Sequence, residues 1–153
     1  MSEEIKKVAI IGAGMMGHGI AQVFAMKGYQ VNLLDIDEEI LKKAKQSIAW
    51  SLNKFVEKRR ISKEDADAAL SRINTTTVYE EAANDIDLAI EAVPENMELK
   101  KKVFAKVDEI APPHTIIATN TSTLSISEMG NATTRPDKAV GMHWFNPPQL
   151  MQL

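Results

Sequence analysis

The segment that decides the fold is KVAIIGAGMMG, residues 7–17, in which an apolar run leads into three glycines spaced G-x-G-x-x-G. The apolar run predicts a short buried strand, and the residues after the third glycine repeat apolar side chains at helical spacing. Gly12 allows the tight turn out of the strand, Gly14 lets the backbone approach a ligand, and Gly17 lets the helix pack against the sheet. A strand, a glycine turn and a helix in this order predict a pyrophosphate site at the start of the helix.

A second strand is predicted over residues 29–34, and it ends in Asp35. Gly28 stands just before this strand, where the C-terminal glycine of a helix belongs. In dinucleotide-binding folds, an acidic residue about 20 positions after the glycine turn bonds the hydroxyls of the adenosine ribose. An incidental surface aspartate is the alternative interpretation, and the agreement of strand, glycines, helix and acid argues against it.

The chain has 153 residues, with 18 basic and 21 acidic side chains and no cysteine. This length allows one domain with a core of ordinary size. The lack of cysteine excludes thiolate nucleophiles and cysteine-ligated metals, and we expect no metal site. The mildly acidic balance argues against a nucleic-acid or anionic-membrane partner. Neither a signal-peptide core nor a membrane-spanning run is visible, so we expect a cytoplasmic protein.

Two helices are predicted between the second and third strands, as an inserted hairpin. A long amphipathic helix follows the acids 37–39, and a shorter helix runs from Ser62 to Leu70. The polar side of the long helix carries five lysines: Lys42, Lys43, Lys45, Lys54 and Lys58. One interpretation is a solvated lysine face, and the other is contact with a phosphate-rich substrate.

The rest of the chain continues to alternate strands and helices. Strands are predicted over residues 74–78, 86–93, 115–118 and 139–142, with helices over 97–110 and 124–129 and a single turn at 79–84. In the 97–110 helix, the residues predicted to face inward are Leu99, Val103, Phe104, Val107 and Ile110. The alternation predicts an α/β, Rossmann-type, doubly wound and mainly parallel sheet with helices on both faces. Ligands of such sheets bind beyond the carboxyl ends of the strands.

Glu95, Ser122 and His143 all follow such strand ends. A nicotinamide enzyme needs a residue that exchanges a proton with the substrate oxygen, and histidine can do this near neutral pH. His143 is the best placed candidate, because His18 lies inside a helix and His114 in a proline-rich turn. A structural role is the alternative for His143. Ser122 could hydrogen-bond the same oxygen, or serve only the chemistry of a turn.

Five segments of the sequence together resemble the N-terminal NAD-binding domain of the 3-hydroxyacyl-CoA dehydrogenase family, and most closely its bacterial 3-hydroxybutyryl-CoA dehydrogenases. They are IGAGMMGHGIAQ (11–22), EAVPEN (91–96), NTSTL (120–124), ATTRP (132–136) and HWFNP (143–147). The resemblance covers essentially the whole chain. It implies oxidoreductase chemistry in fatty acid and butanoate metabolism.

The resemblance also assigns roles to residues. His143 is implied as the catalytic acid/base, with Ser122 holding the substrate oxygen. The implied NAD contacts are Gly12, Ala13, Gly14, Met15, Met16, Gly17, Asp35, Glu95, Lys100, Ser122 and Asn146. The implied coenzyme A contacts are Ser51, Lys58 and Ser122.

Family members continue into a C-terminal helical domain that carries the dimer interface and the glutamate that orients the histidine. We expect residues 1–153 to form the dinucleotide-binding domain, the helical domain to be absent from this chain, and turnover to be slow as a result. The leading hypothesis is hydride transfer between NAD and C3 of a short-chain 3-hydroxyacyl-CoA or 3-oxoacyl-CoA, such as 3-hydroxybutyryl-CoA and acetoacetyl-CoA. The alternatives are an NAD-binding module without turnover and a hydroxyacid dehydrogenase that does not use coenzyme A; the segments at 120–124 and 143–147 argue against the latter.

Overall fold

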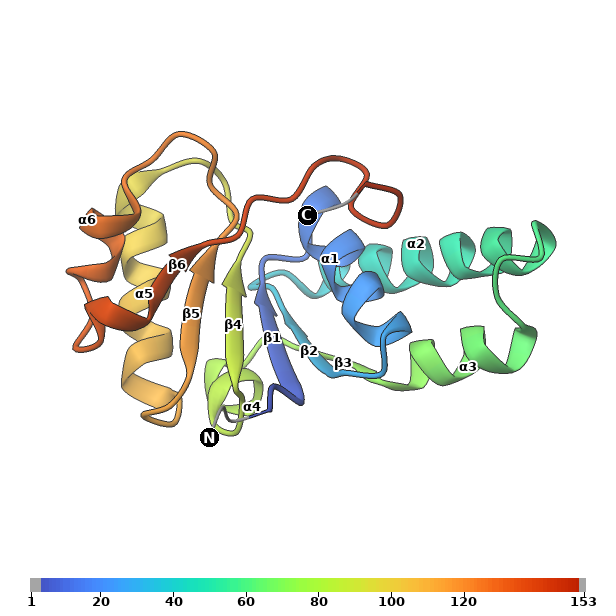
Figure 1. Ribbon diagram of the computed structural model, residues 1–153, viewed down its shortest axis with the longest axis horizontal. Helices are drawn as coiled ribbons and strands as arrows, with labels where there is room; N and C mark the ends of the chain where they lie inside the picture. The colour runs from blue at the N-terminus through green and yellow to red at the C-terminus, as the bar shows by residue number, and fades with distance from the viewer. Residues whose placement is uncertain (1–3, 152–153) are drawn as a thin grey trace.

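One parallel sheet forms the centre of the molecule (Figure 1). The computed structural model describes residues 4–151. The first three and last two residues of the expected 1–153 domain therefore lie outside the described residues. The strands are β1 (Lys7–Ile11), β2 (Gln30–Leu34), β3 (Ile73–Thr76), β4 (Leu88–Glu91), β5 (Ile116–Thr119) and β6 (Ala139–Gly141). Their order is β3-β2-β1-β4-β5-β6, and every neighbouring pair is parallel. The predicted doubly wound sheet is confirmed, and its strand order reverses between β1 and β4.

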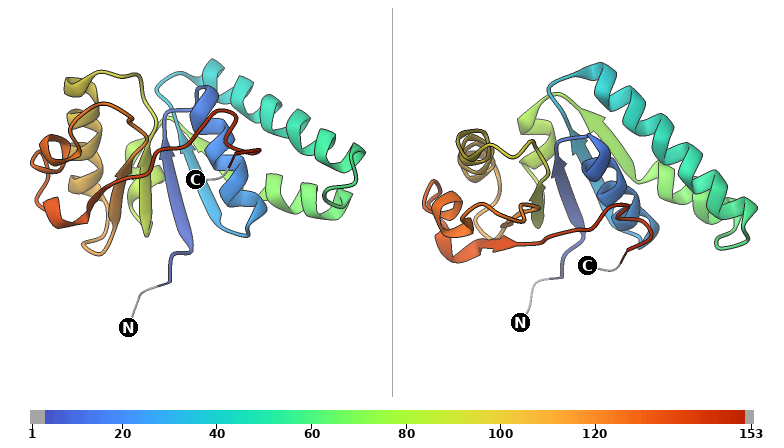
Figure 2. Two further views of the ribbon diagram at one scale, coloured as in Figure 1. Left: turned by 45° about the horizontal axis from the view of Figure 1, so that its top comes forward. Right: turned by 90° about the horizontal axis from the view of Figure 1, so that it is seen from above.

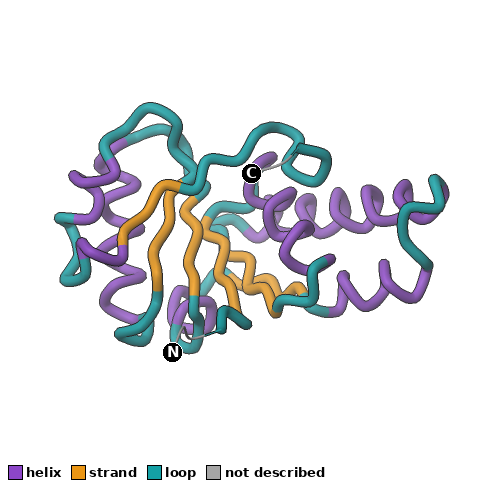
Figure 3. Tube along the Cα trace, viewed as in Figure 1, coloured by secondary structure: helices purple, strands orange, loops and turns teal. Residues whose placement is uncertain are grey.

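Helices cover both faces of this sheet (Figure 2). They are α1 (Met15–Met26), α2 (Glu38–Glu57), α3 (Lys63–Ser71), α4 (Tyr79–Ala83), α5 (Met97–Ile110) and α6 (Ile126–Gly130), with a 3-10 turn η1 (Pro136–Lys138). Val8 and Ile10 pack with α1, α2 and α3, whereas Ala9 and Ile11 pack with α4, α5 and α6. Successive residues of a strand point to opposite faces, so β1 belongs to both apolar cores. The helices therefore flank the strands on either side (Figure 3).

The inserted hairpin consists of α2 and α3, and it extends beyond the sheet (Figure 1). In α2 the buried side chains recur every three or four residues, at Leu41, Ala44, Ile48, Leu52 and Phe55. Ser62 begins α3 by accepting a hydrogen bond from the Asp65 amide at 3.0 Å. Over residues 4–151, no helix is both long enough and apolar enough to cross a membrane.

Several boundaries differ from the sequence predictions. The strand predicted over 86–93 is shorter, because the last ladder bond of β4 runs from the Ala92 amide to the Ile11 carbonyl and the chain then turns away. The helix predicted over 124–129 begins at Ile126, because Ser125 caps its first turn. The helix predicted over 97–110 has those bounds in α5. Within it, the expectation that Leu99 faces the core is wrong: Leu99 is 38% exposed, because it lines a cavity beside the glycine turn.

Candidate active site

The glycine turn between β1 and α1 has the shape that a pyrophosphate site requires. Gly12 has a φ of 105°, and a β-carbon added to it would lie 2.6 Å from the Ala92 carbonyl oxygen. A β-carbon at Gly17 would lie 1.7 Å from the Gly12 carbonyl oxygen, so neither position accepts another residue. Gly14 faces open space, and α1 begins without a side-chain cap or an acid in its first turn. The exposed amides and the positive end of the helix fit an anion.

Asp35 is held at the end of β2 by two backbone amides. Its Oδ2 accepts from the Ala13 amide at 2.9 Å, and its Oδ1 accepts from the Asp37 amide at 3.1 Å. Both aspartates line a cavity of about 600 Å³ that extends to the glycine turn and to Tyr79. Burial, and then the charge of Asp35, raise the pKa of the Tyr79 hydroxyl. Tyr79 is therefore a neutral group that could donate a hydrogen bond beside two carboxylates.

Glu95 and Lys100 belong to a network at the carboxyl ends of β4 and β5. Lys100 is 1% exposed, and its Nζ lies 2.7 Å from Glu91 Oε2 and 3.0 Å from Glu95 Oε1. Burial raises the pKa of Glu95, but hydrogen bonds from Thr121 and Lys100 outweigh it and hold that pKa below its ordinary value. Lys100 therefore has almost no solvent-exposed surface. It can act on a ligand at the carboxyl edge only through Glu95, with which it pairs.

Glu91 and Thr119 also belong to this network, although neither was predicted from the sequence to do so. Thr119 Oγ donates to Glu91 Oε1 at 2.6 Å, and both residues are buried at the ends of their strands. The available signal was an acid inside an otherwise apolar strand, because such a residue needs a buried partner.

His143 and Ser122 come from neighbouring segments. The Met142 amide donates to the Thr119 carbonyl, and the Trp144 amide donates to Asn120 Oδ1, both at 2.8 Å. These bonds place the segment that carries His143 along the start of the loop that carries Ser122. Both side chains are exposed.

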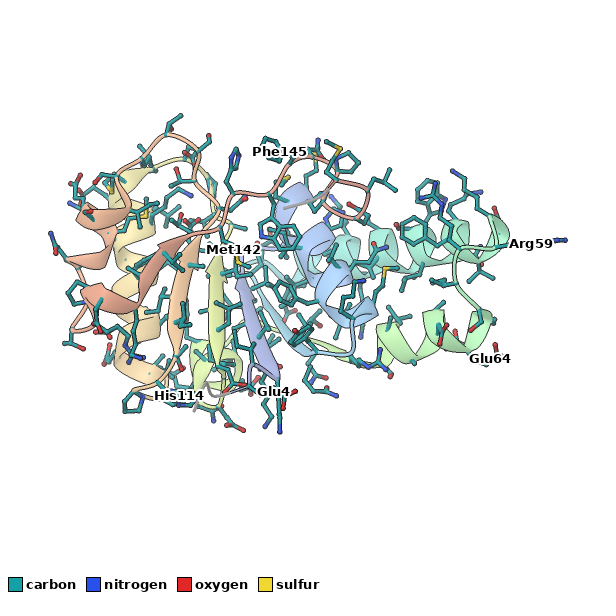
Figure 4. All side chains as sticks on the ribbon, viewed as in Figure 1. Glu4, Arg59, Glu64, His114, Met142 and Phe145 are labelled. Atoms are coloured by element: carbon teal, nitrogen blue, oxygen red, sulfur yellow. The ribbon has the colours of Figure 1, made fainter. Side chains whose placement is uncertain are left out.

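The His143 ring packs against the Phe145 ring, with 4.8 Å between their centroids. Phe145 is labelled in the loop above the sheet in Figure 4. Over residues 4–151, no hydrogen bond reaches either nitrogen of His143. The imidazole is therefore accessible to a substrate, but no described residue orients it.

The last described segment crosses the carboxyl edge of the sheet from β6 to α1 (Figure 1). Trp144 is buried against Phe24 of α1, with 5.9 Å between the ring centroids. Asn146 Nδ2 lies 3.3 Å from Met15 Sδ, at the start of α1. This crossing brings Asn146 from the end of the chain to the glycine turn.

Ser51 lies on α2, and Lys58 directly follows the last residue of this helix. Ser51 Oγ accepts from Gln22 Nε2 at 3.0 Å and lines a second cavity of about 680 Å³ with Trp50 and Lys43. Lys58 is exposed at the end of α2 and is not among the residues that line this cavity. Lys43 is one of the five lysines noted on the polar side of this helix, whereas Trp50 was not singled out from the sequence.

The other two histidines have local partners. His18 Nδ1 lies 2.7 Å from the Gly14 carbonyl oxygen, and His114 Nε2 lies 2.8 Å from Asp87 Oδ1. Among the described residues, no group of three or more His, Asp or Glu side chains could hold a metal ion.

The strand order, the glycine turn and the acid at the end of β2 define a dinucleotide-binding domain of the doubly wound class. Residues 7–153 match the family model described as "3-hydroxyacyl-CoA dehydrogenase, NAD binding domain". This chain belongs to that family, which confirms the resemblance seen in the sequence and the expectation of NAD as cofactor.

Individual relatives agree with this family. The mitochondrial hydroxyacyl-coenzyme A dehydrogenase of Sus scrofa is 44% identical over 154 residues, covering 97% of this chain and 49% of that protein. The 3-hydroxybutyryl-CoA dehydrogenase of Clostridioides difficile is 44% identical, covering 96% of this chain and 52% of that protein. The crystal structure of (S)-3-hydroxybutyryl-CoA dehydrogenase from Ralstonia eutropha has a TM-score of 0.94 at 39% identity, covering 98% of this chain and 53% of that one. The chain spans about half the length of these relatives.

Proposed function

We propose that this chain takes part in hydride transfer between NAD and C3 of a short-chain 3-hydroxyacyl-CoA or 3-oxoacyl-CoA. One observation carries the proposal: the glycine turn, Asp35, the Ser122 loop and His143 all lie at the carboxyl edge of one sheet. A cofactor and a proton-exchanging side chain must meet at one place for this reaction. The relatives named 3-hydroxybutyryl-CoA dehydrogenase support the choice of substrate.

The cofactor would lie across this edge. The backbone of residues 12–17 would hold the pyrophosphate, and Asp35 would accept hydrogen bonds from the adenosine ribose. Glu95, Ser122 and Asn146 would contact the other half, with Lys100 holding Glu95 in place. NAD, when bound, supplies the acceptor for the hydride that leaves C3.

His143 would move the proton. During oxidation a nitrogen of its ring accepts the substrate hydroxyl proton, and during reduction it returns that proton to the forming hydroxyl. The Ser122 hydroxyl would donate a hydrogen bond to the same oxygen and so hold it near the ring.

The acyl-CoA would extend toward α2. Ser51, which lines the second cavity, and the exposed Lys58 are the proposed contacts. A lysine ammonium suits the phosphates of coenzyme A. This proposal favours the phosphate interpretation of the lysine face over simple solvation.

We also propose that residues 1–153 act as the dinucleotide-binding domain and that His143 is oriented by a group outside them. The lack of any hydrogen bond to His143 over residues 4–151 supports this. The relatives are about twice as long as this chain, and dimerisation through their remaining half would fit the family.

NADH oxidation with acetoacetyl-CoA tests the proposal, with parent and His143→Gln compared. We expect both proteins to bind NADH equally in a fluorescence titration. We expect His143→Gln to be slower, but by less than the roughly 10²- to 10⁴-fold that general acid–base catalysis usually contributes, because no described residue orients the imidazole. If the parent binds NADH but is no faster than His143→Gln, the chain is an NAD-binding module without turnover. The exposed imidazole, whose nitrogens make no hydrogen bond within residues 4–151, is the observation that favours this second candidate.

A further inference from the structure

The network at the ends of β4 and β5 contains three charged side chains, Glu91, Glu95 and Lys100, of which Glu91 and Lys100 are buried. Lys100 Nζ has three acceptors: Glu91 Oε2 at 2.7 Å, Glu95 Oε1 at 3.0 Å and the Val93 carbonyl at 3.0 Å. A lysine ammonium has three N–H donors, so each donor has an acceptor. Burying this group together with Glu91 is costly, and ion pairs of this kind are often replaceable by apolar residues.

The hydrogen bonds define Glu91 as a carboxylate. Its Oε2 also accepts from the Val93 amide at 2.7 Å, and its Oε1 accepts from Thr119 Oγ at 2.6 Å. Thr119 Oγ itself accepts from the Thr121 amide at 3.1 Å, which directs its own proton to Glu91. The Lys100 ammonium, the Val93 amide and the Thr119 hydroxyl therefore all donate to Glu91, an arrangement that suits a carboxylate.

Glu95 has the same character. Its Oε2 accepts from the hydroxyls of Thr121 at 2.7 Å and Thr123 at 3.3 Å, while its Oε1 pairs with Lys100. Within residues 4–151, Lys100 is the only cation paired with Glu91 or Glu95. Two carboxylates and one ammonium leave the network with a net charge of minus one.

This charge lies at the point where the strand order reverses. Glu91 is in register with Ile11 of β1 and Thr119 of β5, and the glycine turn follows Ile11 directly. Because Asp35 directs the adenosine half of a dinucleotide over β2, the nicotinamide half must extend over β4 and β5. The buried network would therefore lie beneath or beside the nicotinamide.

We propose, resting on the function proposed above, that this network biases the site between the two redox states of the cofactor. The nicotinamide ring is positively charged in NAD⁺ and neutral in NADH. A net negative charge in a partly desolvated environment attracts the oxidised ring and has no matching attraction for the reduced one. Glu91 is thus a positioning residue that holds Lys100 and Glu95 and sets the charge felt by the ring.

The test compares variants that change this charge with one that does not. Glu91→Gln is nearly isosteric and makes the network neutral. Thr119→Val removes the hydroxyl bond to Glu91 and leaves the charge as it is, so it is the matched control. Dissociation constants for NAD⁺ and for NADH are measured separately by calorimetry near neutral pH in one low-salt buffer, since added salt screens the effect.

In Glu91→Gln we expect the ratio Kd(NAD⁺)/Kd(NADH) to rise by about three- to tenfold, the effect of one charge at roughly 10 Å in a medium of intermediate dielectric constant. In Thr119→Val we expect both cofactors to bind more weakly with an unchanged ratio. If Glu91 had a purely structural role, both variants would bind NAD⁺ and NADH more weakly by the same factor. That result would overturn the proposal.

Circular dichroism shows whether Glu91→Gln folds. If it does not, Glu95→Gln removes one negative charge from a side chain that is 50% exposed, and a smaller shift of the ratio in the same direction is expected, because solvent screens this charge more. No shift in that variant also overturns the proposal. A parent protein that binds neither NAD⁺ nor NADH would instead overturn the proposed function itself.

Discussion

At the scale of single residues, Asp35 and Asp37 should set the choice of dinucleotide. Both line the cavity beside the glycine turn, and two backbone amides hold the Asp35 carboxylate there. We expect NADH to bind at least roughly tenfold more tightly than NADPH, because a 2′-phosphate would face like charge at close range. Fluorescence titration with both cofactors measures this preference. Asp35→Ser should narrow it, Asp67→Ser on α3 should not, and a parent that binds NADPH equally well would contradict the expectation.

Substitutions of Lys43 and Lys58 test the proposed coenzyme A contact. Lys43 lines the cavity that also contains Ser51, whereas Lys58 is exposed at the end of α2. Because neither lysine is deeply buried, each should contribute no more than about 1 kcal/mol to acetoacetyl-CoA binding. Calorimetry of Lys43→Ala and Lys58→Ala measures this loss, with NADH binding as the control. If both variants bind acetoacetyl-CoA like the parent, the lysine face is only solvated.

At the scale of elements, Arg135 joins the end of α5 to β5 and η1. It is buried, and it donates to Asp108 Oδ1 at 2.6 Å and to the carbonyls of Pro112 and Ala111 at 2.6 and 3.2 Å. These acceptors include carbonyls left without partners where the helix ends. The ATTRP segment seen in the sequence thus has a structural function in this molecule.

We therefore expect Arg135→Met to lower the free energy of unfolding by about 3–5 kcal/mol, since it leaves the Asp108 carboxylate, whose side chain is 9% exposed, without its cationic partner. Arg135→Lys should recover part of the loss, because one ammonium cannot reproduce the guanidinium fork. Urea denaturation measures both, with Lys102→Met on the exposed side of α5 as the control. A loss for Arg135→Met no larger than for Lys102→Met would contradict this role.

At the scale of the whole molecule, the two ends of the parallel strands differ in function. The carboxyl edge carries the candidate site, whereas the opposite edge carries Asp87, which accepts from the amides of Lys6 and Lys7 and lies 2.8 Å from His114. This carboxylate ties the start of β1 to the turn before β5. Substitutions at Asp87 should change stability without changing cofactor affinity.

Acid should destabilise the protein through carboxylates at both edges. Burial raises the pKa values of Asp87, Glu95 and Asp108, but the hydrogen bonds each accepts outweigh burial and hold all three below their ordinary values of 3.8, 4.5 and 3.8. Their stabilisation is complete above those values and is lost as the pH falls through the lower native ones. The urea midpoint should therefore begin to fall near pH 4.5. Asp87→Asn should lower the midpoint at neutral pH and flatten this decline, and an equally steep decline would contradict the assignment.

The sequence by itself determined the order of strands and helices, the glycine turn and both ends of α5, because apolar periodicity, glycine and cap residues act within a few positions. It also indicated the carboxyl edge of the sheet as the place of the candidate site. Tertiary structure decided that Lys100 is buried while its neighbour Leu99 is exposed, since only the packed ends of β4 and β5 supply Glu91 as a partner. It likewise decided that the His143 segment runs beside the Ser122 loop through a bond between residues 24 positions apart, from Trp144 to Asn120. Such contacts depend on the path of the whole chain, and no local pattern encodes that path.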